Sequence, residues 1–269
     1  MAAVSSKPTL YADLMSQPSR AVVIFCRVHN LPIDVKLVRL DKGEHRQAWY
    51  KEINPLGKVP VLVDGALRLP ESPAIVLYLS DRFDLPNHWA PRWPRRAAGG
   101  GGASAADSEA AAAARAARFH SALSWQGSSL RGGAMQLLMH RVVGRVFGAP
   151  MVPEVAANGL MQLKASLRDL DHYWLDGGRS GFLAGDEISA ADLLAACELE
   201  QLRLLAGDPA GGPGMEQMLA GFPAVRAWLE RVRSACHPNY DEVHAVLQAA
   251  VAAMAKRAAT ASAAAEAKL

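Results

Sequence analysis

The sequence predicts an α/β domain at the N-terminus and a larger all-α helical domain after it. Two observations support this fold class. Up to about Asp84, short apolar runs typical of strands alternate with segments of helical spacing. From Phe119 onward, apolar residues recur almost throughout at the spacing of amphipathic helices.

The N-terminal domain starts with a strand, a helix and a second strand. We expect a strand over Thr9 to Leu14, an amphipathic helix from about Pro18 to His29, and a strand over Asp34 to Arg39. Two strands joined by one such helix usually pair in parallel, with the helix as the crossover.

The same domain continues with a short helix near Arg46 to Ile53 and an antiparallel hairpin. Val59 to Val63 and Ala66 to Leu69 have the pattern of paired strands, and Asp64-Gly65 predicts a type I′ turn between them. Ser72 has the position of an N-cap for a helix that ends at about Phe83.

The composition changes between the two domains and again near the C-terminus. Residues 97–117 are nearly all Ala and Gly, so we expect poor order from about Arg95 to Ala106. Ala110 to Ala117 alternatively extends the next helix, because Ala is the best helix former. The expected units are a first domain over 8–84, a linker over 85–117, a helical domain over 118–250 and an Ala-rich tail over 251–269.

The chain of 269 residues is 51% hydrophobic, which suffices for a well-buried core. Its net charge of +3 and the absence of a Lys/Arg block argue against nucleic acid as a partner. No apolar run is long enough for a membrane span or a secretory signal. The cysteines Cys26, Cys197 and Cys236 lie far apart, which indicates a reducing compartment and no metal site.

Ser16 raises the first functional question, because its hydroxyl lies where a strand gives way to a helix. Ser is a favoured N-cap and Pro18 suits the first helical turn, so Ser16 has a purely structural interpretation. Ser189 and Asp192 predict a capping box in the helical domain. The tryptophans Trp125, Trp174 and Trp228 are expected in the core.

Four stretches carry a family resemblance: Leu14 to Arg20, Asp41 to His45, Asn54 to Pro60 and Glu71 to Ile75. In this order they resemble the theta class of glutathione transferases, over roughly Leu10 to Leu247 apart from the Ala/Gly insertion. The resemblance implies a thioredoxin-like domain joined to a helix bundle. It also implies conjugation of glutathione to electrophiles, with reduction of organic hydroperoxides as a second activity. The alternative is a non-catalytic binding or scaffold module with this fold.

In this family context, Ser16 would stabilise the glutathione thiolate. A free thiol has a pKa of about 8.5, so its anion needs a hydrogen-bond donor and a positive field at neutral pH. A hydroxyl at a helix N-terminus supplies both. Tyr11 is the rival activator, but it lies earlier, within the expected strand. Cys26 is excluded as a catalytic thiol because it falls in the middle of a helix.

The resemblance also implies how glutathione is held. Val59 would bind the cysteinyl part through its N–H and C=O, oriented by a cis bond to Pro60. Glu71 would bind the γ-glutamyl ammonium, and Ser72 with its helix N-terminus would bind the α-carboxylate.

Four other residues have two interpretations each. His45 and Lys58 would meet the glycine carboxylate, or are solvated surface residues. Arg131 would bind an anionic leaving group or steer glutathione, or forms an ion pair within the bundle. Asp13 is expected to make structural hydrogen bonds rather than to act as a base.

The expected partners are glutathione, small hydrophobic electrophiles or hydroperoxides, and a second copy of the chain in a homodimer. The final residues Ala267-Lys268-Leu269 resemble the Ser-Lys-Leu peroxisomal address, with the cytoplasm as the alternative location. The preceding Ala-rich stretch from Ala258 is expected to be loosely structured, which would leave the tripeptide accessible.

Overall fold

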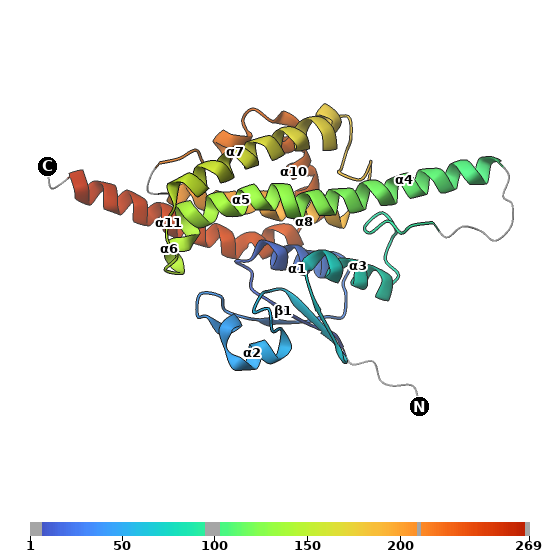
Figure 1. Ribbon diagram of the computed structural model, residues 1–269, viewed down its shortest axis with the longest axis horizontal. Helices are drawn as coiled ribbons and strands as arrows, with labels where there is room; N and C mark the ends of the chain where they lie inside the picture. Colours follow the sequence, from blue (N-terminus) through green and yellow to red (C-terminus); the bar gives the residue numbers. More distant parts are fainter. Residues whose placement is uncertain (1–6, 95–102, 209–210, 267–269) are drawn as a thin grey trace.

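The computed structural model describes residues 7–94, 103–208 and 211–266, with 103–106 and 257–266 described by their backbone alone. A small α/β domain packs beneath a larger helical domain (Figure 1). This arrangement confirms the predicted fold class.

The N-terminal domain is built on one mixed sheet of four strands in the order β2-β1-β3-β4. The strands are β1 (Thr9–Ala12), β2 (Asp34–Leu37), β3 (Val61–Asp64) and β4 (Leu67–Pro70). β1 pairs in parallel with β2, as expected for strands joined by the helix α1 (Gln17–Val28). β3 pairs antiparallel with β1 and with β4.

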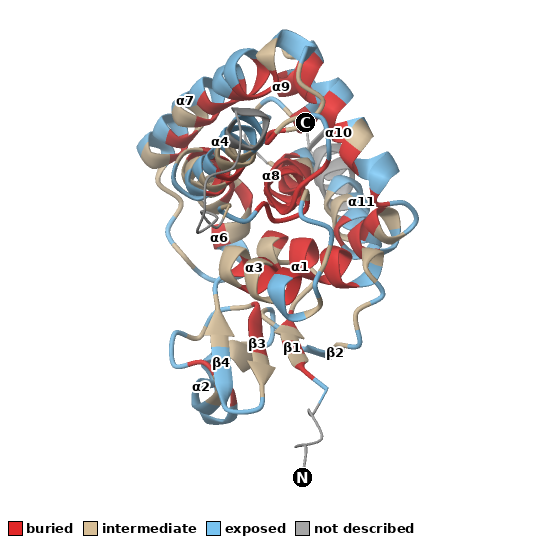
Figure 2. Ribbon diagram, turned by 90° about the vertical axis from the view of Figure 1, so that its right-hand side faces the viewer, coloured by how far each residue is buried: buried red, intermediate tan, exposed pale blue. Residues whose placement is uncertain are grey.

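The side chains of β1 point alternately to the two faces of the sheet, and each face packs against different helices. Leu10 and Ala12 belong to the large core that includes α1 and α3 (Ser72–Arg82). Tyr11 points to the other face and packs on a small cluster with Tyr50 of α2 (Ala48–Ile53), which follows the 3-10 turn η1 (Glu44–Arg46). The α1 and α3 layer lies between the sheet and the helical domain (Figure 2).

Two local predictions in this domain are corrected. Asp64 remains in β3, and only Gly65 of the predicted turn pair has a positive φ, of 56°. The hairpin turn is therefore not the type I′ turn, which needs positive φ at both central residues. Helix α3 begins at Ser72 itself, so Glu71 rather than Ser72 is in the N-cap position.

The helical domain begins with one long rod made of several segments (Figure 1). In order, these are α4 (Ala103–Trp125), the short π-helix η2 (Gln126–Leu130), α5 (Arg131–Leu138), the short π-helix η3 (Met139–Val143) and α6 (Gly144–Val146). The remaining segments are α7 (Pro153–Asp169), η4 (Leu170–Trp174), η5 (Asp176–Gly178), α8 (Ala190–Gln201), η6 (Leu202–Gly207), α9 (Met215–Leu219), α10 (Pro223–Ala235) and α11 (Asn239–Glu266).

Helix α8 lies at the centre of the molecule, and every one of its residues is buried. Figure 2 shows it surrounded by the other helices and directly above α1. Its start is the predicted capping box, in which the Asp192 carboxylate accepts hydrogen bonds from the N–H and hydroxyl of Ser189 at 2.9 and 2.7 Å. The expected core residues Trp174 and Trp228 are buried, and Trp125 is partly buried against the same core.

The Ala-rich segments differ from the expectation of loose structure. α4 already begins at Ala103, which is the helix-extension alternative carried further, and α11 continues through the tail to Glu266. Both results follow from the high helix propensity of Ala. Residues 95–102 of the expected poorly ordered stretch, and the C-terminal tripeptide, lie outside the described residues. No helix in the described part is long and apolar enough to cross a bilayer.

Candidate active site

Ser16 lies at the N-cap of α1, in extended conformation with φ −86° and ψ 123°. Its backbone N–H donates to the Asp13 carbonyl at 2.9 Å, and its own carbonyl accepts from the Arg20 N–H at 3.0 Å. Its half-buried side chain makes no capping hydrogen bond. Ser16 therefore has the position of a cap without the bond that defines one, and the hydroxyl remains available at the N-terminus of the helix.

The turn before Ser16 is organised by Asp13. Its carboxylate accepts the N–H of Met15 at 2.8 Å and the N–H of Leu40 at 2.8 Å. These bonds agree with the structural role expected for Asp13. They connect the turn after β1 to the segment after β2, so they help to fix the approach of the chain to α1.

The Val59-Pro60 peptide bond is cis, as the resemblance implied. Lys58, which precedes Val59, is held through its backbone: the Lys58 carbonyl accepts hydrogen bonds from the Tyr50 hydroxyl and the Asn54 side-chain amide, both at 2.7 Å. Pro60 is buried at the start of β3, whereas the side chain of Lys58 is exposed. The loop backbone around Val59 is thus anchored on α2.

Glu71 adopts φ 71° and ψ 112°, which is unusual for a residue other than glycine. Such backbone strain persists only where the surroundings impose it, and it is concentrated at functional sites. Glu71 itself is exposed, and Ser72 is buried in the first turn of α3. The carboxylate and the free N–H groups at the start of α3 are therefore adjacent.

His45 lies in η1, against the loop that carries Lys58. A side chain on Gly57 would come within 3.1 Å of the His45 carbonyl, which shows how closely the two loops pack. Burial, and secondarily the charge of Arg46, lowers the pKa of His45. At neutral pH this imidazole is a hydrogen-bonding group rather than a cation, so of the two residues only Lys58 carries the positive charge.

Arg131 forms an ion pair with Glu198 of α8, which is the bundle ion pair considered as its alternative role. The Glu198 side chain is 2% exposed, and its carboxylate also accepts the amide of Gln17 at 3.1 Å. Gln17 directly follows Ser16, so Arg131 is connected to the start of α1 through a single buried carboxylate. Burial raises the pKa of Glu198, whereas Arg131 and Gln17 oppose that shift.

Comparison with known proteins decides the family. Residues 10–87 match the model of the glutathione S-transferase N-terminal domain, and residues 153–231 match that of the C-terminal domain. Glutathione S-transferase T1 of Arabidopsis thaliana is 37% identical over 90% of this chain and 89% of its own length. Human glutathione S-transferase theta-1 is 35% identical over 88% of both chains. The chain belongs to the theta class of glutathione S-transferases.

A solved structure supports the same assignment. Human glutathione transferase theta-2, described as a complex with glutathione and an unknown ligand, superimposes with a TM-score of 0.74 at 30% identity. The match covers 93% of this chain and 91% of that one. The theta-class resemblance inferred from the four motifs is confirmed, and the chain is a transferase enzyme.

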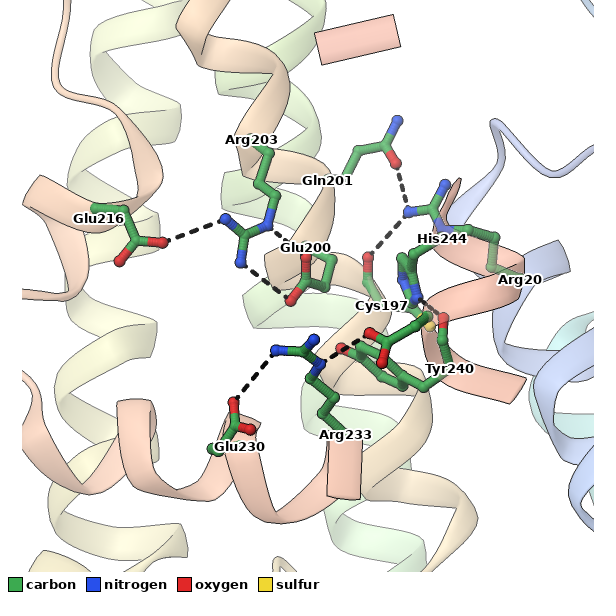
Figure 3. Close-up of polar contacts among 11 residues, drawn as sticks. Arg20, Cys197, Glu200, Gln201, Arg203, Glu216, Glu230, Arg233, Tyr240 and His244 are labelled. Carbon is green, nitrogen blue, oxygen red and sulfur yellow. Dashed lines mark hydrogen bonds and ion pairs between the residues drawn. The ribbon is translucent and has the colours of Figure 1, made fainter. Parts of the chain in front are cut away.

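A cavity of about 840 Å³ in this glutathione S-transferase lies elsewhere, among α8, α9, α10 and α11. None of the predicted site residues lines it. Its arginines are largely paired: Arg203 binds Glu200 and Glu216, and Arg233 binds Glu230 and Asp241 (Figure 3). The residues of the candidate site lie instead in the loops before α1, β3 and α3.

The three cysteines are free and buried. Burial raises the pKa of the Cys26 thiol to about 12, and it also raises the pKa values of the Cys197 and Cys236 thiols. Within the described ranges, no cluster of His, Cys, Asp or Glu has the arrangement of a metal site.

The polar contacts between the start of α1 and the helical domain were not predicted from the sequence. Gln17 and Arg20 of α1 bind Glu198 and Gln201 of α8, respectively. Their signal was a run of polar residues at the end of the otherwise apolar helix, where Glu198, Glu200 and Gln201 follow Leu193 to Cys197. All three polar residues are buried.

Proposed function

We propose that this transferase conjugates the thiolate of glutathione to electrophiles and that Ser16 donates the hydrogen bond that stabilises the thiolate. The observation that carries the proposal is the Ser16 hydroxyl, which sits at the N-terminus of α1 without making a capping bond. A donor and a helix N-terminus directed at one sulfur lower its pKa from about 8.5. Each unit of that shift corresponds to about 1.4 kcal/mol.

In the proposed binding mode, glutathione lies along the edge formed by three loops. The backbone of Val59 pairs with the cysteinyl residue, and Pro60 sets the direction of that strand. Glu71 binds the γ-glutamyl ammonium, while Ser72 and the start of α3 bind its carboxylate. Lys58 and His45 hold the glycine carboxylate, with Lys58 as the cation.

In the reaction, the thiolate attacks the electrophilic atom and forms the carbon–sulfur bond as the leaving group departs with its electron pair. No covalent bond to the enzyme is required. Arg131 pairs with Glu198, and its side chain is still 34% exposed, so the proposed contact with an anionic leaving group is left to the exposed part of its guanidinium. A hydroperoxide is a second electrophile: the thiolate attacks its terminal oxygen, the O–O bond breaks, and the alcohol leaves after taking up a proton. The thiol of a second glutathione then converts the resulting sulfenic acid to glutathione disulfide and water.

We also propose a homodimer and a peroxisomal location, with the cytoplasm as the alternative location. The location is supported by Ala267-Lys268-Leu269 alone. A fluorescent protein fused in front of this C-terminus should give puncta that coincide with a peroxisomal marker. A diffuse signal that is unchanged on deletion of Leu269 would contradict the peroxisomal location.

Light scattering at micromolar concentration tests the proposed homodimer, and a monomer mass would contradict that proposal.

One experiment distinguishes the proposed transferase activity from the alternative of a non-catalytic scaffold. The purified protein should bind immobilised glutathione and turn over an alkyl halide with glutathione. Cumene hydroperoxide with glutathione tests the second activity separately. A protein that neither binds glutathione nor turns over either substrate would support the scaffold and overturn the proposal.

A further inference from the structure

Two consecutive backbone carbonyls just before Ser16 are bound by side chains from the domain interface. The guanidinium of Arg20 donates to the Leu14 carbonyl at 2.9 Å, and the side-chain amide of Gln201 donates to the Met15 carbonyl at 3.1 Å. Gln201 is the last residue of α8 in the helical domain, whereas Leu14 and Met15 belong to the first domain.

Arg20 and Gln201 also bind each other. The guanidinium donates to the Gln201 amide oxygen at 2.6 Å and to the Cys197 carbonyl at 3.4 Å (Figure 3). Arg20 is fully buried and Gln201 nearly so. Because Arg has only donors and the Met15 carbonyl only accepts, the orientation of the Gln201 amide is fixed by its two partners.

Such a buried pair costs desolvation, and the cost is offset only if its polar atoms are well satisfied. Two of the four hydrogen bonds that the Arg20 and Gln201 side chains make go to the carbonyls of Leu14 and Met15, and the Arg20 Nε is left without a partner among the described residues. The peptide group between Met15 and Ser16 carries one of these carbonyls, so its orientation sets the direction in which the Ser16 side chain leaves the backbone. Displacements of about 1 Å at a reacting group can cost up to about 100-fold in rate.

We infer that Arg20 and Gln201 are positioning residues for Ser16, and that they make the thiolate-stabilising geometry depend on the docking of α8 against α1. The inference rests on the proposed function of Ser16. It assigns the chemistry to Ser16 alone, with the pair acting through the backbone of Leu14 and Met15.

Gln201→Glu tests the pair with a change of one side-chain group. The carboxylate keeps an acceptor for Arg20 but loses the donor to the Met15 carbonyl. We expect kcat to fall about tenfold, and the pKa of the bound glutathione thiol to rise. KM for glutathione should stay within about twofold, since the loops around Val59 and Glu71 are untouched. The Ser16 amide should exchange its hydrogen faster, by mass spectrometry of the peptide that contains it.

Gln136→Glu is the matched control. Gln136 lies on α5 of the same domain and contacts Gln162 and Asn158, not the turn before Ser16. It should leave kcat, thiol pKa and exchange of the Ser16 amide at wild-type values. A purely structural effect of a Gln-to-Glu change would lower stability without moving the thiol pKa.

Folded Gln201→Glu protein with wild-type kcat and wild-type exchange at Ser16 would overturn the inference. If this variant does not fold, the wild-type protein still decides, because the Ser16 amide, which donates to the Asp13 carbonyl at 2.9 Å, must exchange more slowly than amides in exposed loops. Exchange as fast as in an exposed loop would overturn it. If the wild-type protein lacks turnover, the proposed function fails. The exchange rate of the Ser16 amide would still show whether Arg20 and Gln201 hold the turn before Ser16.

Discussion

The ion pair between Arg131 and Glu198 joins a guanidinium whose side chain is 34% exposed to a carboxylate that is buried at the centre of the molecule. The same carboxylate accepts the side-chain amide of Gln17, the neighbour of Ser16. The Glu198 carboxylate therefore connects Arg131 of the helical domain to the start of α1, directly after Ser16.

Arg131→Ala should therefore lower both stability and activity. Removing the cation leaves a buried charge on Glu198, which we expect to cost about 2 kcal/mol, less than for a fully buried partner. Urea unfolding measures this loss. Adding Glu198→Gln to Arg131→Ala should recover part of the stability, because the amide carries no charge. If the double variant is no more stable than the single one, the unpaired charge is not the cause.

Asp192→Ala should be more damaging. In addition to Ser189, the Asp192 carboxylate accepts the Leu183 N–H at 2.8 Å and the Trp228 indole N–H at 2.8 Å. Its loss leaves these buried donors unsatisfied, at an expected cost of about 3 kcal/mol in unfolding free energy. Asp186→Ala, at an exposed position nearby, should change stability by less than about 0.5 kcal/mol. Equal effects of the two substitutions would contradict the account of the capping box.

His244 should make the fold sensitive to mild acid. Burial lowers its pKa to about 4, and Arg20 and Arg203 also oppose its charge while Glu200 and its bond to the Tyr240 carbonyl favour it. The unfolded chain takes up this proton near pH 6.5, so stability is full above that pH and is lost as pH falls toward about 4. Between pH 7 and 5 the loss amounts to about 2 kcal/mol.

His244→Gln removes this titration and keeps a donor for the Tyr240 carbonyl. Urea unfolding at the two pH values should show a smaller loss for the variant than for the wild type. The same loss in both proteins would show that His244 does not carry the pH dependence.

The sequence motifs predicted local backbone features of the candidate site. Ser16 before α1, the cis bond at Pro60 and Glu71 before α3 each depend on a few neighbouring residues. The contacts of Arg20 with Gln201 could not be predicted, because the two residues are 181 positions apart and meet only when the domains pack. Loose structure was wrongly expected for the described Ala-rich segments. An Ala-rich sequence has the low complexity of a flexible segment, but Ala also has the highest helix propensity.

Ser16→Ala should lower kcat/KM for conjugation by about 100-fold, as expected when a positioned donor to an anion is lost. Folding should be unchanged, because the hydroxyl makes no capping bond. Ser234→Ala is the control. Ser234 is exposed on α10 of the helical domain, so loss of its hydroxyl should have little effect on the rate.

The most direct test is a titration of the thiol of bound glutathione, followed by thiolate absorbance in the wild type and in Ser16→Ala. We expect the pKa of the bound thiol to lie below the free value of about 8.5 in the wild type. In Ser16→Ala the pKa of the bound thiol should return most of the way to that value. The same depressed pKa in both proteins would show that Ser16 does not stabilise the thiolate.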